Sequence, residues 1–200
     1  SSDIVEINDT GLAACVDEAL AEKGMLEVER LTRLVCRKRQ IHSLDGISAL
    51  RNLRVLDLSQ NEITDVSPVT DLIYLKKLLL SKNGITQIDN FDSMTWLQEL
   101  WLDNNQLNDI SPIGRLQALQ ILHLSNNQIS SIAALQNHSR LKELRLNNNP
   151  IFDLSLLGRL PELRGLSVNG TALTDISSLV NHPRLNQLWL SQTWLSNISP

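Results

Sequence analysis

Leucine recurs along the chain at intervals of 22 residues, and the spacing has no insertion or deletion. The leucines that keep it are Leu31, Leu53, Leu75, Leu97, Leu119, Leu141, Leu163 and Leu185. Most of them open the pattern LxxLxLxxNxI, as Leu53, Leu56, Leu58, Asn61 and Ile63 do. A fixed period of roughly 20 to 50 residues indicates a repeat architecture, in which each unit buries its apolar face against its neighbours.

Each xLxLx segment predicts one short strand. Side chains alternate between the two faces of a strand, so the leucines point inward and the residues between them point outward. Strands of successive repeats then pair into one parallel sheet. Because the apolar residues alternate instead of forming continuous runs, we expect one face of the sheet to be buried and the other to be an open, concave surface.

The return path behind each strand is short. The segments "VSP" at 66–68 and "ISP" at 110–112 favour turns and 3-10 segments over long helices, because proline disfavours helical geometry in the residue before it. An asparagine follows each central strand, and its amide can bond backbone groups of its own and the adjacent repeat. It stands at positions 61, 83, 105, 127 and 149. Arg39 replaces it in the first repeat, which predicts a degenerate repeat beside a cap.

We expect residues 1–30 to form a helical cap and residues 31–200 to form eight repeats, the last one incomplete, in one continuous unit. The segment "NDTGLAACVDEALAEKG" at 8–24 predicts an amphipathic helix that begins at Asp9 or Thr10 and stops at Gly24. Cys15 lies on its inward face, and Cys36 takes an inward leucine position of the first repeat. This convergence favours a Cys15–Cys36 disulfide, which would imply an oxidising compartment. Two buried free thiols are the alternative.

The repeats resemble the leucine-rich repeat family over about residues 31–200. The resemblance implies an α/β solenoid with a curved parallel β-sheet on the concave face, short 3-10 and turn segments on the convex face, and an N-terminal helical cap. With its cap and ISP segments, the chain is similar to bacterial surface or secreted proteins of the internalin type. That similarity implies protein recognition outside the cell, at the cell surface or in the periplasm. An intracellular scaffold or enzyme-regulatory subunit of the phosphatase-regulator type, which has the same period, is the alternative.

The outward strand positions vary, whereas the inward ones are nearly constant. An exposed Leu79, Trp101 and Ile121 inside a charged rim would have the composition of a protein interface. Isolated apolar residues tolerated on a surface are the alternative. The residues expected to bind a protein ligand on the concave face are Lys77, Leu79, Glu99, Trp101, Ile121, His123, Glu143, Arg145 and Trp189.

The net charge of −4 argues against a protein held broadly to nucleic acid, although the N-terminal part of the concave face is basic. That basic part fits either solvated surface charge or steering of an acidic partner. No apolar run is long enough to span a membrane. Since the apolar underside of the last repeat needs cover, we expect further C-terminal repeats, another domain or a partner there.

The sequence predicts no cofactor, no metal site and no enzymatic activity. His123 has Glu99, Glu143 and Ser125 nearby on the same face, so a general base is conceivable. A shallow open sheet, however, offers no oxyanion site. His138 and His182 replace convex leucines two repeats apart and are expected to be half exposed.

Overall fold

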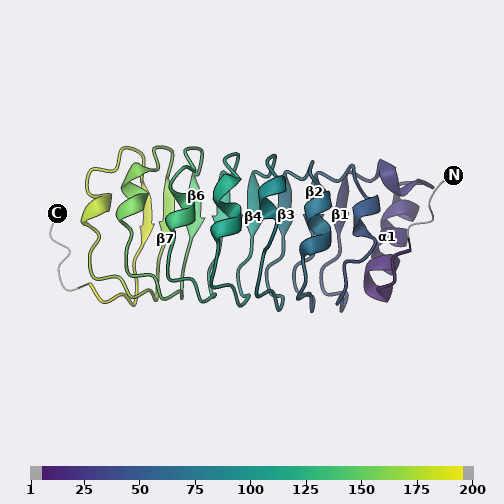
Figure 1. The fold of residues 1–200 in the computed structure, drawn as a ribbon, viewed down its shortest axis with the longest axis horizontal. Helices are drawn as coiled ribbons and strands as arrows, with labels where there is room; N and C mark the ends of the chain where they lie inside the picture. Colours follow the sequence, from purple (N-terminus) through teal and green to yellow (C-terminus); the bar gives the residue numbers. More distant parts are fainter. Residues whose placement is uncertain (1–5, 196–200) are drawn as a thin grey trace.

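In the computed structural model, which describes residues 6–195, the chain winds into a solenoid with strands on one side and 3-10 segments on the other (Figure 1). Within this range the strands form one eight-stranded parallel sheet in sequence order. Each pairing has the same register, as in Leu78 opposite Leu100 and Leu100 opposite Leu122. The predicted solenoid fold is therefore confirmed.

The strands are three residues long and recur with the leucine period. They are β1 (Arg33–Val35), β2 (Val55–Asp57), β3 (Lys77–Leu79), β4 (Glu99–Trp101), β5 (Ile121–His123), β6 (Glu143–Arg145), β7 (Gly165–Ser167) and β8 (Gln187–Trp189). The middle residue of each strand is an inward leucine, and those of β1 to β7 are buried in one continuous core. The outer face of this sheet is called the concave face below.

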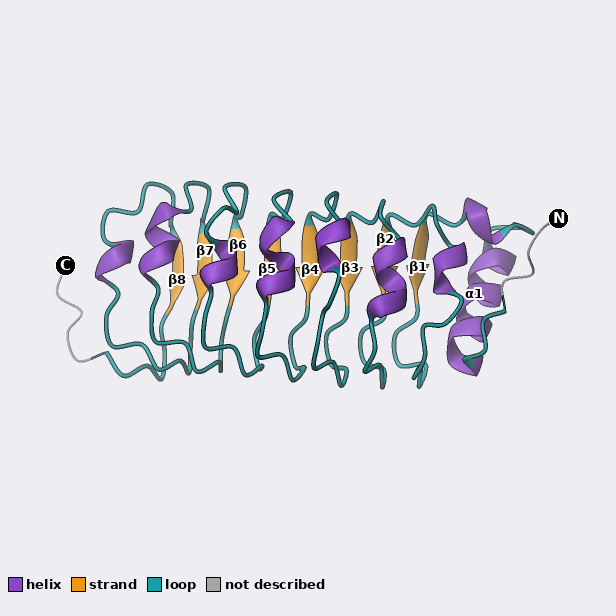
Figure 2. Cartoon of the chain, in the orientation of Figure 1, coloured by secondary structure: helices purple, strands orange, loops and turns teal. Residues whose placement is uncertain are grey.

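Short 3-10 segments form the opposite side of the solenoid and stand in front of the strands in Figure 2. They are η1 (Val28–Arg30), η2 (Ile47–Ala49), η3 (Ser67–Asp71), η4 (Phe91–Ser93), η5 (Ser111–Arg115), η6 (Ala133–Leu135), η7 (Ser155–Arg159) and η8 (Ser177–Leu179). Pro68 and Pro112 stand in the first turn of η3 and η5, where the missing N–H of proline breaks no helical hydrogen bond.

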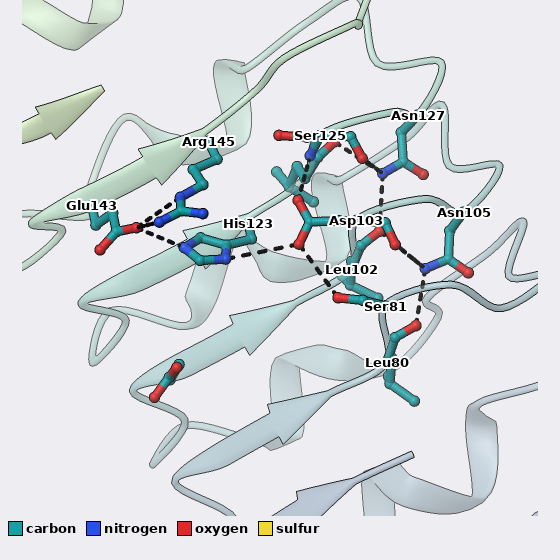
Figure 3. Close-up of polar contacts among 12 residues, drawn as sticks. Leu80, Ser81, Leu102, Asp103, Asn105, His123, Ser125, Asn127, Glu143 and Arg145 are labelled. Carbon is teal, nitrogen blue, oxygen red and sulfur yellow. Dashed lines mark hydrogen bonds and ion pairs between the residues drawn. The ribbon is translucent and has the colours of Figure 1, made fainter. Parts of the chain in front are cut away.

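A ladder of asparagines ties consecutive turns together. Asn105 Nδ2 donates to the carbonyls of Leu80 and Leu102 at 3.1 and 3.0 Å, and Asn105 Oδ1 accepts from the Ile85 amide (Figure 3). Asn61, Asn83, Asn127 and Asn149 repeat this arrangement. Thr171 keeps a bond within its own repeat, to the Val168 carbonyl. These bonds satisfy turn groups that would otherwise be buried without a partner.

The cap is helix α1 (Thr10–Glu22), which covers the N-terminal end of the core with Leu12, Cys15 and Val16. Asp9 is its N-cap and accepts a hydrogen bond from the Leu12 amide at 2.9 Å. A disulfide joins Cys15 to Cys36, as the sequence predicted.

The last described repeat is more open than the others. Leu188 is 38% exposed, whereas the leucines at its position in β1 to β7 are buried. Trp189 and Trp194 are exposed as well. In the described part of the chain, α1 is the only α-helix, and no helix has the length and apolar character that crossing a membrane requires.

The prediction that His138 is half exposed is wrong, because its side chain is fully buried. Its position recurs every 22 residues on the convex side of the solenoid. Most other repeats place a leucine there, and this leucine packs inside the core. Neither ring nitrogen has a hydrogen-bond partner with good geometry among the described residues.

Candidate functional site

Strands β3 to β6 place the predicted binding residues in two rows on the concave face. The strand register puts Lys77, Glu99, Ile121 and Glu143 side by side in one row. It puts Leu79, Trp101, His123 and Arg145 side by side in the other. The structure does not bring Trp189 to this group, because β7 separates β8 from β6.

The prediction that Leu79 is exposed is wrong, because its side chain is only 2% exposed, and His123 beside Trp101 is only 4% exposed. Both point outward, but side chains of adjacent strands cover them. His123 lies beneath the stacked ring of Trp101 on one side and the carboxylate of Glu143 on the other. An outward position on the sheet therefore does not by itself give an exposed side chain.

The indole of Trp101, which is half-buried, lies between two nitrogen-bearing side chains. Lys77 Nζ is 5.2 Å from the ring, within the range of a cation–π contact, and also pairs with Glu99 Oε1 at 2.8 Å. The imidazole of His123 stacks on the indole with ring centroids 4.7 Å apart. The indole nitrogen has no hydrogen-bond acceptor among the described residues.

His123 is held by carboxylates at both ring nitrogens (Figure 3). Nε2 lies 2.9 Å from Glu143 Oε1, and Nδ1 lies 3.8 Å from Asp103 Oδ2. Arg145 donates from Nε and Nη2 to the same Glu143 oxygen at 2.9 and 2.8 Å. Burial acts to raise the pKa of Glu143, but the hydrogen bond from His123 and the charge of Arg145 outweigh it and lower this pKa.

Asp103 belongs to this cluster, although the sequence did not identify it as a binding residue. Its Oδ1 accepts from the Ser125 amide at 2.9 Å, and its Oδ2 accepts from Ser81 Oγ at 3.3 Å. The signal was present in the 22-residue period, since short polar side chains occupy this position in successive repeats: Ser59, Ser81, Asp103, Ser125 and Asn147.

An open hollow of about 540 Å³ lies over this cluster and the turns that follow the strands. Its lining includes Trp101, Asp103, Ile121, His123 and Arg145. Such a hollow can receive side chains of a ligand, with an indole and an aliphatic group for apolar contact and paired charges around them.

The geometry does not assemble a hydrolytic centre from His123. Its ring is nearly inaccessible, and both nitrogens face carboxylates. Ser125 Oγ has no hydrogen-bond partner among the described residues, so no base activates it. Within residues 6–195, no group of three or more His, Cys, Asp or Glu side chains is placed to hold a metal ion.

Part of the predicted basic charge on the concave face is neutralised locally. Arg37 Nε donates to Asp57 Oδ2 at 2.6 Å, and Lys77 pairs with Glu99. Lys82 lines the hollow without a carboxylate partner among the described residues. The hollow thus carries charges of both signs.

The repeat geometry and the concave site define a solenoid of the leucine-rich repeat class. The family model for leucine-rich repeats in two copies matches residues 29–71, 75–115 and 117–158, and the chain belongs to this family.

Solved structures of internalins are similar to the chain. Internalin C2 from Listeria monocytogenes has 29% sequence identity and a TM-score of 0.73, with 92% of this chain and 93% of that chain covered. Internalin F from the same organism has 26% identity and a TM-score of 0.68, with 95% and 71% covered. A leucine-rich repeat protein of Leptospira interrogans has 27% identity and a TM-score of 0.81, with 84% of this chain and 45% of that one covered. A comparison with curated protein sequences found no match.

Proposed function

We propose that the chain is a non-enzymatic recognition module that binds a protein ligand on its concave face. The observation that carries the proposal is the hollow over β4 to β6, where Trp101 and Ile121 lie among paired charged side chains. Interfaces concentrate their binding energy in such aromatic and aliphatic anchors inside a polar rim. Membership of the leucine-rich repeat family, whose members typically mediate protein interactions, supports it.

The unpaired indole N–H of Trp101 gives independent support. A buried donor without an acceptor costs roughly 1 to 3 kcal/mol, and each such group in a native protein needs a reason. A ligand that displaces the side chains around Trp101 and supplies an acceptor would recover this energy on binding.

The ligand-binding residues we assign are those of the hollow and its rim, with Trp189 as a separate anchor further along the sheet. They are Lys77, Leu79, Glu99, Trp101, Ile121, His123, Glu143, Arg145 and Trp189. Because Leu79 and His123 are buried, their part is to support Trp101 rather than to touch the ligand first.

We place the protein outside the cytoplasm of a bacterium, secreted or on its surface. The Cys15–Cys36 disulfide supports this location over the intracellular scaffold, since disulfides persist in oxidising compartments. Mass spectrometry of native protein alkylated without reductant tests it. A mass two hydrogens below that of the dithiol form supports export, and two alkylated thiols would favour the scaffold.

Selection from a displayed library of natural protein fragments tests the concave-face ligand. Fragments that bind the wild type should also bind Phe152→Ala, which removes an exposed aromatic ring outside the hollow. The same fragments should lose most of their affinity for Trp101→Ala, by about 2 kcal/mol or more for a hot spot. Equal affinity for both variants would place the ligand elsewhere.

A further inference from the structure

Three large apolar residues stand in the loops that lead from η3 into β3 and from η4 into β4. These loops lie at the top of Figure 2. Ile73, Tyr74 and Trp96 are 44%, 43% and 57% exposed. Tyr74 and Trp96 hold equivalent positions in adjacent repeats, whose strands lie about 4.8 Å apart. We call these three residues the aromatic edge. It precedes the strands, whereas the hollow extends over the turns that follow them.

The fold does not require aromatic residues at this edge. The positions equivalent to Tyr74 and Trp96 in the other repeats are polar or small: Asn52, Ala118, Arg140, Glu162 and Arg184. The positions equivalent to Ile73 include Arg51, Thr95, Gln117 and Ser139. Since the same loop forms with all of these residues, the packing of the solenoid does not require the exposed rings.

The surroundings of the aromatic edge are cationic. The Arg54 guanidinium lies 4.7 Å from the centre of the Tyr74 ring, and its Nη1 donates to the Tyr74 carbonyl at 3.3 Å. Arg51 and Lys76 are exposed, and neither reaches a carboxylate within ion-pairing distance in the described part of the chain. The carboxylates of the 3-10 segments that precede the two loops are Asp71 in η3 and Asp92 in η4, and Asp92 pairs with Arg115 at 3.5 Å. Arg51, Arg54 and Lys76 form no ion pair within the described part of the chain, so they attract a partner of negative charge.

We propose that the aromatic edge is a second docking surface, distinct from the concave hollow, for an acidic segment of a partner protein that carries apolar side chains. Exposed Trp, Tyr and Arg are the residues that most often dominate binding energy at protein interfaces. The apolar side chains of the segment contact Trp96 and Tyr74, and its carboxylates pair with Arg51, Arg54 and Lys76. A second copy of this chain is a poorer occupant, because a two-fold contact would bring the same cations together.

Binding of two short synthetic peptides to the whole chain tests the proposal. One peptide alternates glutamate and leucine, the other alternates lysine and leucine, and both have blocked ends. NMR titration should show saturable binding of the glutamate peptide with shifts at the Trp96 indole, and binding of the lysine peptide about tenfold weaker or more. Added sodium chloride should weaken the glutamate peptide, because exposed charges are screened.

Matched variants locate the surface. Trp96→Ala should weaken the glutamate peptide about tenfold or more, and Arg54→Glu should do so without removing an aromatic ring. Arg140→Ala, at the equivalent position two repeats away, should change the affinity less than about twofold. Absence of saturable binding, equal affinity of Trp96→Ala and wild type, or equal affinity for the two peptides would each overturn the proposal. A concentration-dependent dimer that Trp96→Ala dissociates would overturn it in favour of a second copy. None of these outcomes bears on the concave-face ligand.

Discussion

The imidazole ring of His123 lies against the indole of Trp101, with ring centroids 4.7 Å apart and an angle of 22° between the planes. Trp101 belongs to β4, and His123 holds the register position beside it on the adjacent strand β5, one repeat later in the chain. This stack shelters His123 and fixes the orientation of the half-buried indole above the hollow. The rigid sheet beneath it holds both residues in register.

The stack predicts unequal effects of removing Trp101 and its inward neighbour Leu100. Trp101→Ala should lower the free energy of unfolding by about 1 to 2 kcal/mol, because it removes contacts with Lys77 and His123 at a partly exposed site. Leu100→Ala should cost roughly 2 to 5 kcal/mol, because it leaves a cavity in the core. Urea denaturation of both variants measures the difference. Equal losses would mean that the indole packs as a core residue.

Gly158 and Gly114 predict opposite outcomes for the same substitution. They hold equivalent positions in η7 and η5, two repeats apart. A Cβ atom at Gly158 would lie 2.6 Å from the Ser178 carbonyl oxygen, whereas at Gly114 the nearest atom would be the Ala134 carbonyl oxygen at 3.6 Å. Gly158→Ala should therefore lower stability by about 1 to 3 kcal/mol. Gly114→Ala should be neutral or stabilise by up to about 1 kcal/mol. Thermal unfolding of the pair tests this, and equal melting temperatures would contradict it.

Replacement of His138 by leucine should stabilise the fold and reduce its sensitivity to acid. Burial lowers the pKa of His138 from its ordinary value of 6.5, and the nearby carbonyls of Ile113 and Leu135, which form no well-aligned hydrogen bond with the ring nitrogens, oppose this effect only in part. The unfolded chain takes up the proton more readily, so the contribution of this residue to stability is complete above pH 6.5 and is lost as the pH falls through the lowered pKa. His138→Leu should raise the free energy of unfolding by about 1 kcal/mol at neutral pH, since it removes unsatisfied buried nitrogens.

The gain of His138→Leu should grow when the pH is lowered below 6.5, which urea denaturation at several pH values measures. His182→Leu is the matched control. His182 Nε2 lies 3.1 Å from the Leu160 carbonyl oxygen, and Nδ1 accepts from the Leu185 amide at 3.2 Å. His182→Leu breaks these bonds and should not stabilise the protein. A stabilisation of equal size by both variants would refute the role of the unsatisfied ring.

Asp9 should attach the cap to the first repeat in a pH-dependent way. Its Oδ1 accepts from the Leu12 amide, and its Oδ2 accepts from the amides of His42 and Ser43 at 2.8 and 3.1 Å. Burial tends to raise the pKa of Asp9, but these backbone donors outweigh it and hold the pKa below the usual 3.8. The contribution of the carboxylate is therefore complete above pH 3.8 and is lost as the pH falls through the lowered pKa.

Asp9→Ala should lower stability by about 1 to 2 kcal/mol at neutral pH, as the loss of an N-cap does. Amide hydrogen exchange of α1 measures the effect, which should shrink in strong acid where the wild-type carboxylate is protonated. Asp9→Asn keeps an acceptor oxygen for the Leu12 amide and should cost less. A difference between wild type and Asp9→Ala that does not vary with pH would show that the charge plays no part.

The cap and the ladder show how far the sequence predicts local structure. Asp9 was one of two predicted N-caps for α1, and the structure selects it. The asparagine at position 105 was expected to serve its own and an adjacent repeat, and its amide bonds Leu102 and Leu80 accordingly. These features depend on residue type and on a fixed separation along the chain, which the sequence states directly.

The candidate site was predicted only in part. The register that puts Trp101 beside His123 follows from the 22-residue period. The burial of His123 does not follow from it, and neither does the position of Asp103 beside the Nδ1 atom of the imidazole. Each depends on the rotamers that long side chains from two flanking repeats adopt over a neighbour.

The sequence by itself determined the solenoid, the order of its strands and the inward leucines, and it favoured the disulfide. A chain whose apolar residues recur at a fixed period buries them by stacking its repeats in register. Only the tertiary structure decided which outward side chains reach solvent, which ions pair, and that Tyr74 and Trp96 form an exposed edge. Exposure is a property of the groups that surround a residue in space, and here these groups come from repeats that lie one period away in the chain.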